Sequence, residues 1–288
     1  MKVFPLKPKG LLFLLPTFLL LLLTGIGRPA TAQGEAPRFT AITSMDGLSA
    51  NTVTAILKDR YGLLWFATDD GLNKFDGTGF TVYRHQKKDS TSLKSNDVSS
   101  IYEDRSGRIW VGTIIGSLHL YDRRKDSFVR IKTYHSINSI CEDSQGKIWV
   151  GTTQGLVIVD PRTWGIQAFA SVPGTPVQIA GKHVHRIFRD RNRQMWVGTS
   201  NGLFRFRAAQ NRFESVDYRG ATSFQNGSEF VTAMGQDSSG RMWIGTQNGL
   251  FVVDGQASRH FSYQPGNSHS ISNNMVFSIG IQGRDEVW

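Results

Sequence analysis

The 288-residue sequence contains a single cysteine, Cys141. One thiol cannot form a disulfide within the chain, so a small fold held together by several disulfides is excluded. Charge of one sign is not concentrated either, because runs such as residues 122–126 and 189–193 mix basic and acidic side chains. No basic stripe with interleaved aromatic residues is present. The sequence therefore predicts a mildly basic, solvated surface and no nucleic-acid partner.

Long apolar runs are also scarce, and the one that stands out lies at the N-terminus, at residues 11–23. Lys2, Lys7 and Lys9 precede it, and the small residues 30–32 follow it. This layout is typical of a secretory signal peptide, and the run is shorter than the roughly 20 residues of a spanning helix. We therefore expect a signal peptide at 1–32, export to the periplasmic side, and a mature domain at 33–288. Removing the four basic residues of the signal reduces the formal net charge from +10 to +6, with 29 basic and 23 acidic residues left.

A tryptophan-centred repeat dominates the rest of the sequence. The heptapeptide at 107–113 (GRIWVGT) returns at 146–152 (GKIWVGT), and looser copies occur at 62–68, 193–199 and 240–246. Successive repeat tryptophans are 45, 39, 47, 47 and 45 residues apart, a period typical of solenoids or propellers. An aspartate stands six residues before, and a glycine six residues after, each of the first five. The repeat tryptophans are Trp65, Trp110, Trp149, Trp196 and Trp243, followed by Trp288 in an incomplete sixth copy.

Each unit is predicted to form four short strands, with the tryptophan in the second. In that strand Trp110 alternates with Ile109 and Val111, so both faces are apolar. The small residue two positions after each tryptophan, such as Gly112, leaves room for a side chain of a neighbouring sheet. Four-stranded antiparallel sheets covered on both faces predict an all-β fold, a β-propeller with about five full blades and the start of a sixth. Cys141 falls in a first strand, where we expect a buried, inert thiol.

One end of each blade is predicted to carry the binding surface. There the connection from the fourth strand to the next first strand varies from 18 residues (Phe80 to Val98) to 9 (Phe128 to Ile137). Variable loops on a rigid scaffold are typical of binding sites, although loops that drift freely would vary equally. The candidate ligand-binding residues are Asn51, Asn96, His135, His183 and Asn274, with Asp70, Asn201 and Asn248 in the turns. Such groups suit a neutral sugar; alternatively, Asn51, Asn96 and Asn274 only cap the starts of strands.

Catalytic and metal-binding patterns are weak. His183 and His185 lie two apart in a first strand and point to one side, but a third ligand at matching spacing is missing. Polar lining of a central channel explains the pair equally well. Paired carboxylates for glycoside hydrolysis and a nucleophile with its base are not evident. We therefore predict no catalytic residue, metal or cofactor in this stretch.

Residues 46–84 carry a pattern that resembles a known family. The lead-in DGLS, the apolar first strand, the Gly-x-x-Trp core and the third strand GLNKFD are similar to the two-component regulator propeller repeat. The resemblance covers 39–288; Arg193, in place of the glycine before Trp196, is a local departure. It implies the N-terminal sensor of a hybrid histidine kinase or related regulator, which binds a small molecule or oligosaccharide. Kinase, membrane anchor and a homodimeric assembly would then belong to the full-length protein, beyond residue 288.

A secreted propeller enzyme, a lyase or glycosidase acting on polysaccharide, is the alternative function. It requires clustered carboxylates or arginines, which the sequence does not indicate.

The two ends of the chain predict that the ring of blades does not close within this sequence. Residues 38–43 read as a fourth strand and residues 275–281 as a first strand. We expect the chain to be the N-terminal fragment of a longer product, with an exposed apolar flank.

Overall fold

The computed structural model describes residues 40–133, 135–168, 179, 182–220, 230–282 and 286–288. The chain divides into Met1–Ala41 and Ile42–Trp288, and all elements below belong to the second unit. The predicted signal peptide lies outside the described residues, and its boundary stays a prediction.

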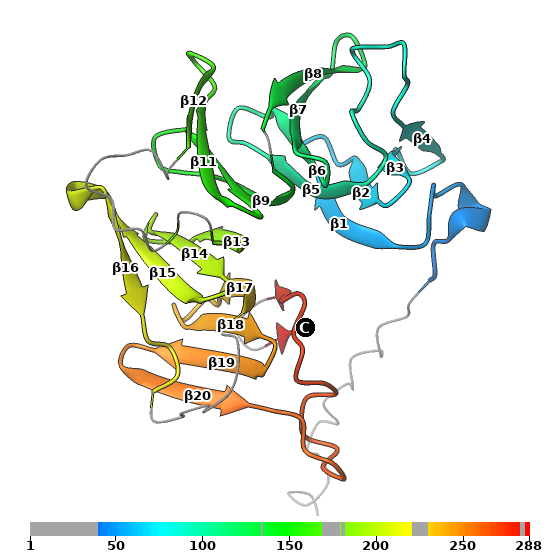
Figure 1. Ribbon diagram of the computed structural model, residues 1–288. Coiled ribbons are helices and arrows are strands. Elements are labelled where there is room, and N and C mark those ends of the chain that lie inside the picture. The colour runs from blue at the N-terminus through cyan, green and yellow to red at the C-terminus, as the bar shows by residue number, and fades with distance from the viewer. Residues whose placement is uncertain (1–39, 134, 169–178, 180–181, 221–229, 283–285) are drawn as a thin grey trace, which may run out of the picture. The chain divides into compact units, whose positions relative to one another are not determined.

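Five sheets of four antiparallel strands follow one another along the chain, as Figure 1 shows. Blade 1 contains β1 (Val53–Lys58), β2 (Leu64–Thr68), β3 (Gly71–Phe75) and β4 (Phe80–Tyr83). Blade 2 contains β5 (Val98–Glu103), β6 (Ile109–Thr113), β7 (Ser117–Asp122) and β8 (Ser127–Lys132). Blade 3 contains β9 (Ile137–Glu142), β10 (Ile148–Thr152), β11 (Gly155–Asp160) and β12 (Gly165–Ala168). Blade 4 contains β13 (Val184–Arg189), β14 (Met195–Thr199), β15 (Gly202–Arg207) and β16 (Arg212–Val216). Blade 5 contains β17 (Val231–Gln236), β18 (Met242–Thr246), β19 (Gly249–Asp254) and β20 (Ala257–Phe261).

The predicted all-β, multi-blade propeller fold is therefore confirmed. Within each blade the strands pair in chain order. The first pair always carries a bulge one residue after the strand begins, as between Val98 and Ser100, which face Thr113 and Gly112 of β6. Within the described residues, the short 3-10 helices Ser44–Asp46 and Ala208–Gln210 lie outside the sheets.

Consecutive blades pack through the faces that the repeat predicts. Ile109 and Val111 join Trp65 in one apolar cluster, whereas Trp110 joins Ile137 and residues of blade 3 in the next. A Cβ on Gly112 would lie 2.5 Å from the Ile137 side chain, so this glycine makes room for the next blade, as expected. The tryptophans are not equivalent, however. Trp65, Trp110 and Trp149 are at most 1% exposed, but Trp196 and Trp243 are half-buried.

Side-chain hydrogen bonds also link neighbouring first strands. Thr54 donates to the carbonyl of Val98 (2.6 Å), Ser99 to that of Ile137 (2.5 Å) and Asn138 to that of Val184 (2.8 Å). Thr232 donates in the same way to the Val276 carbonyl. The corresponding residue of blade 4 is His185, whose Nε2 is buried without a hydrogen-bond partner. The described part of the chain thus carries this bridge at the three junctions from blade 1 to blade 4 and from blade 5 to Val276, and lacks it between blades 4 and 5.

The segments at the two ends of the repeat differ from expectation. Residues 40–43 of the expected strand 38–43 are not in a strand, and 38–39 lie outside the described residues. In the expected strand 275–281, only Ile281 lies in a strand, within β21 (Ile281–Gln282) against β22 (Glu286–Val287). Gly280 exchanges backbone hydrogen bonds with Trp288 at 2.8 Å, and the N–H of Val276 donates to the Thr246 carbonyl at 2.9 Å. Apolar side chains are exposed here and in β1, including Phe277 (76%) and Ile56 (65%), as expected of an apolar flank.

Candidate ligand-binding face

The predicted ligand-binding residues of the five blades lie at one end of each blade, which we call the connection end, and Asn274 lies in the segment that follows blade 5. There β2 ends and β3 begins, so the turn with Asp70 lies beside the start of β1, where Val53 pairs with Thr68. The same register places Asn201 beside His183 in blade 4 and Asn248 beside the residues before β17 in blade 5. The sheet geometry thus brings these groups to one end of each blade, as the strand order predicts.

A direct cluster forms between blades 1 and 2. The Asp70 carboxylate pairs with the guanidinium of Arg84 at 2.9 Å and accepts from Asn96 Nδ2 at 3.2 Å. The bonded Arg84 lowers the pKa of Asp70 below its usual value. Asn96 Oδ1 also accepts from the backbone N–H of His85 at 2.7 Å. Asp70 and Asn96 are therefore held together, and Arg84, which was not predicted, joins them.

The other asparagines before first strands hold their own loops. Asn51 Oδ1 accepts from the backbone N–H of Ser44 at 2.8 Å, and Asn274 Oδ1 accepts from that of Tyr263 at 2.7 Å. Asn274 and Tyr263 are eleven residues apart, as are Asn96 and His85. Both connections are therefore built alike. These contacts agree with the capping role, although they leave the amide nitrogens of Asn51 and Asn274 available to a ligand.

The remaining candidates are less engaged. Asn201 and His135 are both exposed. The side chain of Asn201 accepts a hydrogen bond from Ser200 Oγ at 3.2 Å. The rings of His183 and His185 are stacked with centroids 4.2 Å apart. Burial lowers the pKa of His183, and burial together with its neighbour lowers the pKa of His185 to about 4. Both imidazoles are therefore neutral at pH 7 and can bond a hydroxyl group.

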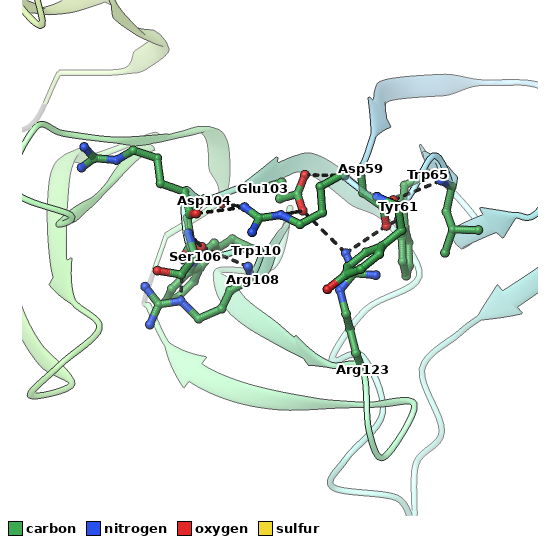
Figure 2. A network of polar contacts seen from close by, with 12 residues as sticks. Asp59, Tyr61, Trp65, Glu103, Asp104, Ser106, Arg108, Trp110 and Arg123 are labelled. Atoms are coloured by element: carbon green, nitrogen blue, oxygen red, sulfur yellow. Dashed lines mark hydrogen bonds and ion pairs between the residues drawn. The ribbon is translucent and has the colours of Figure 1, made fainter.

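The repeated aspartate has a role that the sequence analysis described only in part. At the opposite end of the blade, which we call the turn end, Asp104 Oδ1 accepts from the backbone N–H groups of Ser106 and Arg108, as expected of the turn. Its Oδ2 accepts from the indole N–H of Trp110 at 2.8 Å (Figure 2). The same pair recurs in the other four blades, with distances of 2.9–3.0 Å. The constant six-residue spacing between the two residues was the signal for this contact.

The described residues offer few other reactive or metal-binding groups. Burial raises the pKa of Cys141 to about 11, so the thiol is protonated and unreactive, as predicted. Among the described residues, no group of three or more His, Cys, Asp or Glu side chains could hold a metal ion. The part of the chain that the structure describes contains no helix long and apolar enough to cross a membrane.

Blades of this construction define the class of the protein, a β-propeller. The sequence profile of the family described as "Two component regulator propeller" matches residues 47–70, 92–114, 133–154, 178–201 and 226–248. Each match runs from the approach to a first strand through the tryptophan strand into the turn that follows. The five blades are therefore repeats of the two-component regulator propeller family.

Individual relatives agree with this assignment. Histidine kinase P4 of Formosa agariphila is 48% identical over 62 residues, which are 22% of this chain and 4% of the kinase. The extracellular domain of a protein described as a hybrid two component system, from Bacteroides thetaiotaomicron, is 25% identical with a TM-score of 0.55. That match covers 84% of this chain and 39% of the other. A streptogramin B lyase is similar in fold alone, with a TM-score of 0.61, 12% identity, and coverage of 84% and 76%. The chain thus spans a small part of the kinase and well under half of the sensor domain.

Proposed function

We propose that the blades form the ligand-sensing part of an extracytoplasmic two-component sensor whose output is a histidine kinase. The observation that carries the proposal is the coincidence of all five blades with matches to the two-component regulator propeller profile. The likeness to a histidine kinase and to an extracellular sensor domain supports it. The predicted signal peptide would bring the blades to the periplasmic side.

The ligand we propose is a small neutral oligosaccharide bound at the connection end. Amide and neutral imidazole groups, such as Asn201, Asn248 and His183, bond hydroxyls without burying a charge. The sheets behind them form a packed scaffold, because the second strands of blades 2 to 5 are mostly buried. A rigid scaffold with polar groups at one end lowers the ordering cost of binding.

The proposal is tested by titrating a library of neutral oligosaccharides against the intact chain. Saturable binding of at least one sugar is expected, and Asn201→Ala, Asn248→Ala or His183→Ala should weaken it about tenfold, the loss of one good hydrogen bond. Thr81→Ala, at an exposed position of β4, is the matched control and should bind as the wild type. Binding that survives all three changes would place the ligand elsewhere. Turnover of a sugar would instead favour the secreted enzyme.

A further inference from the structure

The turn end of the blades carries a repeated ion pair between neighbours. In blade 1, Arg60, the residue after the turn aspartate, pairs with Glu103 at the end of β5 at 2.9 Å. Figure 2 shows Glu103 beside Arg123, which also bonds Asp59 at 2.9 Å. In blade 2, Arg105 pairs with Glu142 at the end of β9 at 3.0 Å. Each basic turn residue thus faces the carboxylate that ends the first strand of the next blade.

Blade 4 reverses the sign of this arrangement. Arg189 stands where blades 2 and 3 have Glu103 and Glu142, and its guanidinium donates only to the backbone carbonyl of Asp143, at 3.0 Å. The residue that faces the turn of blade 4 is Gln236 of blade 5, which accepts from the backbone N–H of Arg191 at 2.9 Å. The ion pairs that start from the turns of blades 1 and 2 are therefore not repeated at the turn of blade 4, where Arg189 and Arg191 lie with the neutral amide of Gln236.

The guanidinium groups of Arg191 and Arg193 have no partner. Within the described residues, neither group makes a hydrogen bond or an ion pair. The carboxylate of Asp190, which lines the same part of the turn end, is already used. It accepts from the backbone N–H of Gln194 at 2.8 Å and from the indole of Trp196 at 2.9 Å. Asp104 and Asp237, by contrast, each hold an arginine at 2.6 Å. Blade 4 therefore has an excess of positive charge at its turn end.

Arg193 occupies this place at a conformational cost. Its φ is +64°, in the left-handed region, where the other four turns have Gly62, Gly107, Gly146 and Gly240. A residue with a side chain is strained in this region, and such strain is concentrated at functional sites. A glycine would relieve the strain, so the retention of an arginine calls for a use of its side chain.

These arginines line one cavity of about 470 Å³. Its walls are Arg105, Arg189, Arg191 and Arg193, with Asp190, Phe188 and Gln236. We propose that this cavity binds a small ligand with a carboxylate, sulfate or phosphate group. Guanidinium forks bind the planar or tetrahedral oxygens of such groups bidentately. The cavity is larger than one ion needs and falls in the range that holds small organic ligands, so we favour an acidic sugar. This site lies at the opposite end of the blades from the proposed neutral-sugar face and does not depend on it.

Titration of the intact chain tests the site with four probes: sulfate, phosphate, a uronic-acid disaccharide and its neutral counterpart. We expect the uronic-acid disaccharide to bind, the neutral one not to bind, and added salt to weaken the affinity. Tighter binding of the disaccharide than of sulfate or phosphate identifies an acidic sugar. Equal binding of all three anions identifies a bare oxyanion site and overturns the preference for a sugar.

Substitutions separate this role from a structural one. Arg191→Ala and Arg189→Glu, the latter restoring the residue type of blades 2 and 3, should each weaken binding about tenfold or more. Arg193→Gly should weaken binding while it raises the unfolding temperature, a combination that a purely structural arginine does not produce. Arg212→Ala, an exposed arginine of β16, is the control for loss of charge and should change neither property. If no anion binds, or if the three variants bind as the wild type, the inference is wrong.

Discussion

In blade 2 the first strand carries Ser99, Ser100 and Glu103, whereas in blade 4 the corresponding residues are His185, Arg186 and Arg189. The two blades share strand order and register, including the bulge in the first pair. Ser99 of blade 2 bonds the Ile137 carbonyl of the next blade, and Glu103 pairs with Arg60 of blade 1. In blade 4, the Nε2 atom of His185 is buried without a hydrogen-bond partner, and Arg189 lines the pocket beside Arg191. The fold therefore tolerates a change from residues that fasten blades together to residues available to a ligand.

The tryptophans should show the largest difference between the two blades. Trp110 is fully buried and Trp196 half-buried. Trp110→Ala should cost about 3–5 kcal/mol in the free energy of unfolding, and Trp196→Ala about 2 kcal/mol. Denaturant unfolding of both variants measures the two losses in the free energy of unfolding. Losses equal to within about 0.5 kcal/mol would show that the two indoles fill equivalent contacts.

Acid should destabilise blade 2 through His119, which is fully buried and accepts from the backbone N–H of Lys94 at 3.1 Å. Burial lowers the pKa of His119 from 6.5 to about 4. Between these values the unfolded chain binds the proton more readily, so stability is complete above pH 6.5 and declines as the pH falls towards 4. The loss at pH 4 is about 3 kcal/mol at most.

The His119→Asn variant sharpens this test, because Asn73 occupies the corresponding buried place in blade 1. Its unfolding free energy should depend less on pH between 6.5 and 4 than that of the wild type. His269→Gln, at an exposed position, is the control. An unchanged pH profile in His119→Asn would assign the acid sensitivity to other groups.

The turns should respond to glycine in opposite directions. Arg193→Gly should stabilise the chain by about 1 kcal/mol by relieving the left-handed strain. Gly107→Ala in blade 2 should destabilise it by a similar amount, because φ is +82° and a Cβ would lie 2.7 Å from Arg60 Cζ. Thermal unfolding of the two variants checks both signs. Destabilisation by Arg193→Gly would mean that the arginine side chain supports the fold.

The smallest effect concerns the bridge that blade 4 lacks. Ser99→Ala removes the hydrogen bond to the Ile137 carbonyl and should cost about 1 kcal/mol. His185→Thr should supply the missing bridge to blade 5 and gain about 0.5 kcal/mol. The comparison needs chemical denaturation of both variants. A loss of stability in His185→Thr would show that packing of the imidazole outweighs the missing bond.

Much of this fold could be predicted from the sequence because the repeat records it five times. The second-strand pattern around Trp110 predicted the two apolar faces, and Gly112 predicted the close approach of the next blade. Exposure of Trp196 could not be predicted, since it depends on which residues of blade 5 reach it. Residues 275–281 have the apolar pattern of a first strand but are mostly not in a strand. An apolar pattern therefore does not form a strand unless a partner strand pairs with it.

The site was harder to predict. Sheet register fixes the ends of strands, so the sequence could indicate which residues lie at the connection end, but their hydrogen bonds to Ser44, His85 and Tyr263 depend on loop conformation. Residues 189–193 contain three arginines and one aspartate and were interpreted as an ordinary solvated surface. The structure shows why this was incomplete. The Asp190 carboxylate accepts hydrogen bonds from the backbone of the turn and from the indole of Trp196, so it does not pair with Arg191 or Arg193.

The packing of each tryptophan strand on the blade that follows it has a consequence for how the chain acquires its structure. Contacts between blades join units about 45 residues apart in sequence, and each blade finds its partner in the next one. Such nearest-neighbour coupling resembles a one-dimensional array, in which order spreads from unit to unit. A chain that emerges N-terminus first can therefore fold vectorially, each new blade adding to a finished template. The junction between blades 4 and 5, where His185 does not supply the bridge, is then the step at which this propagation should pause.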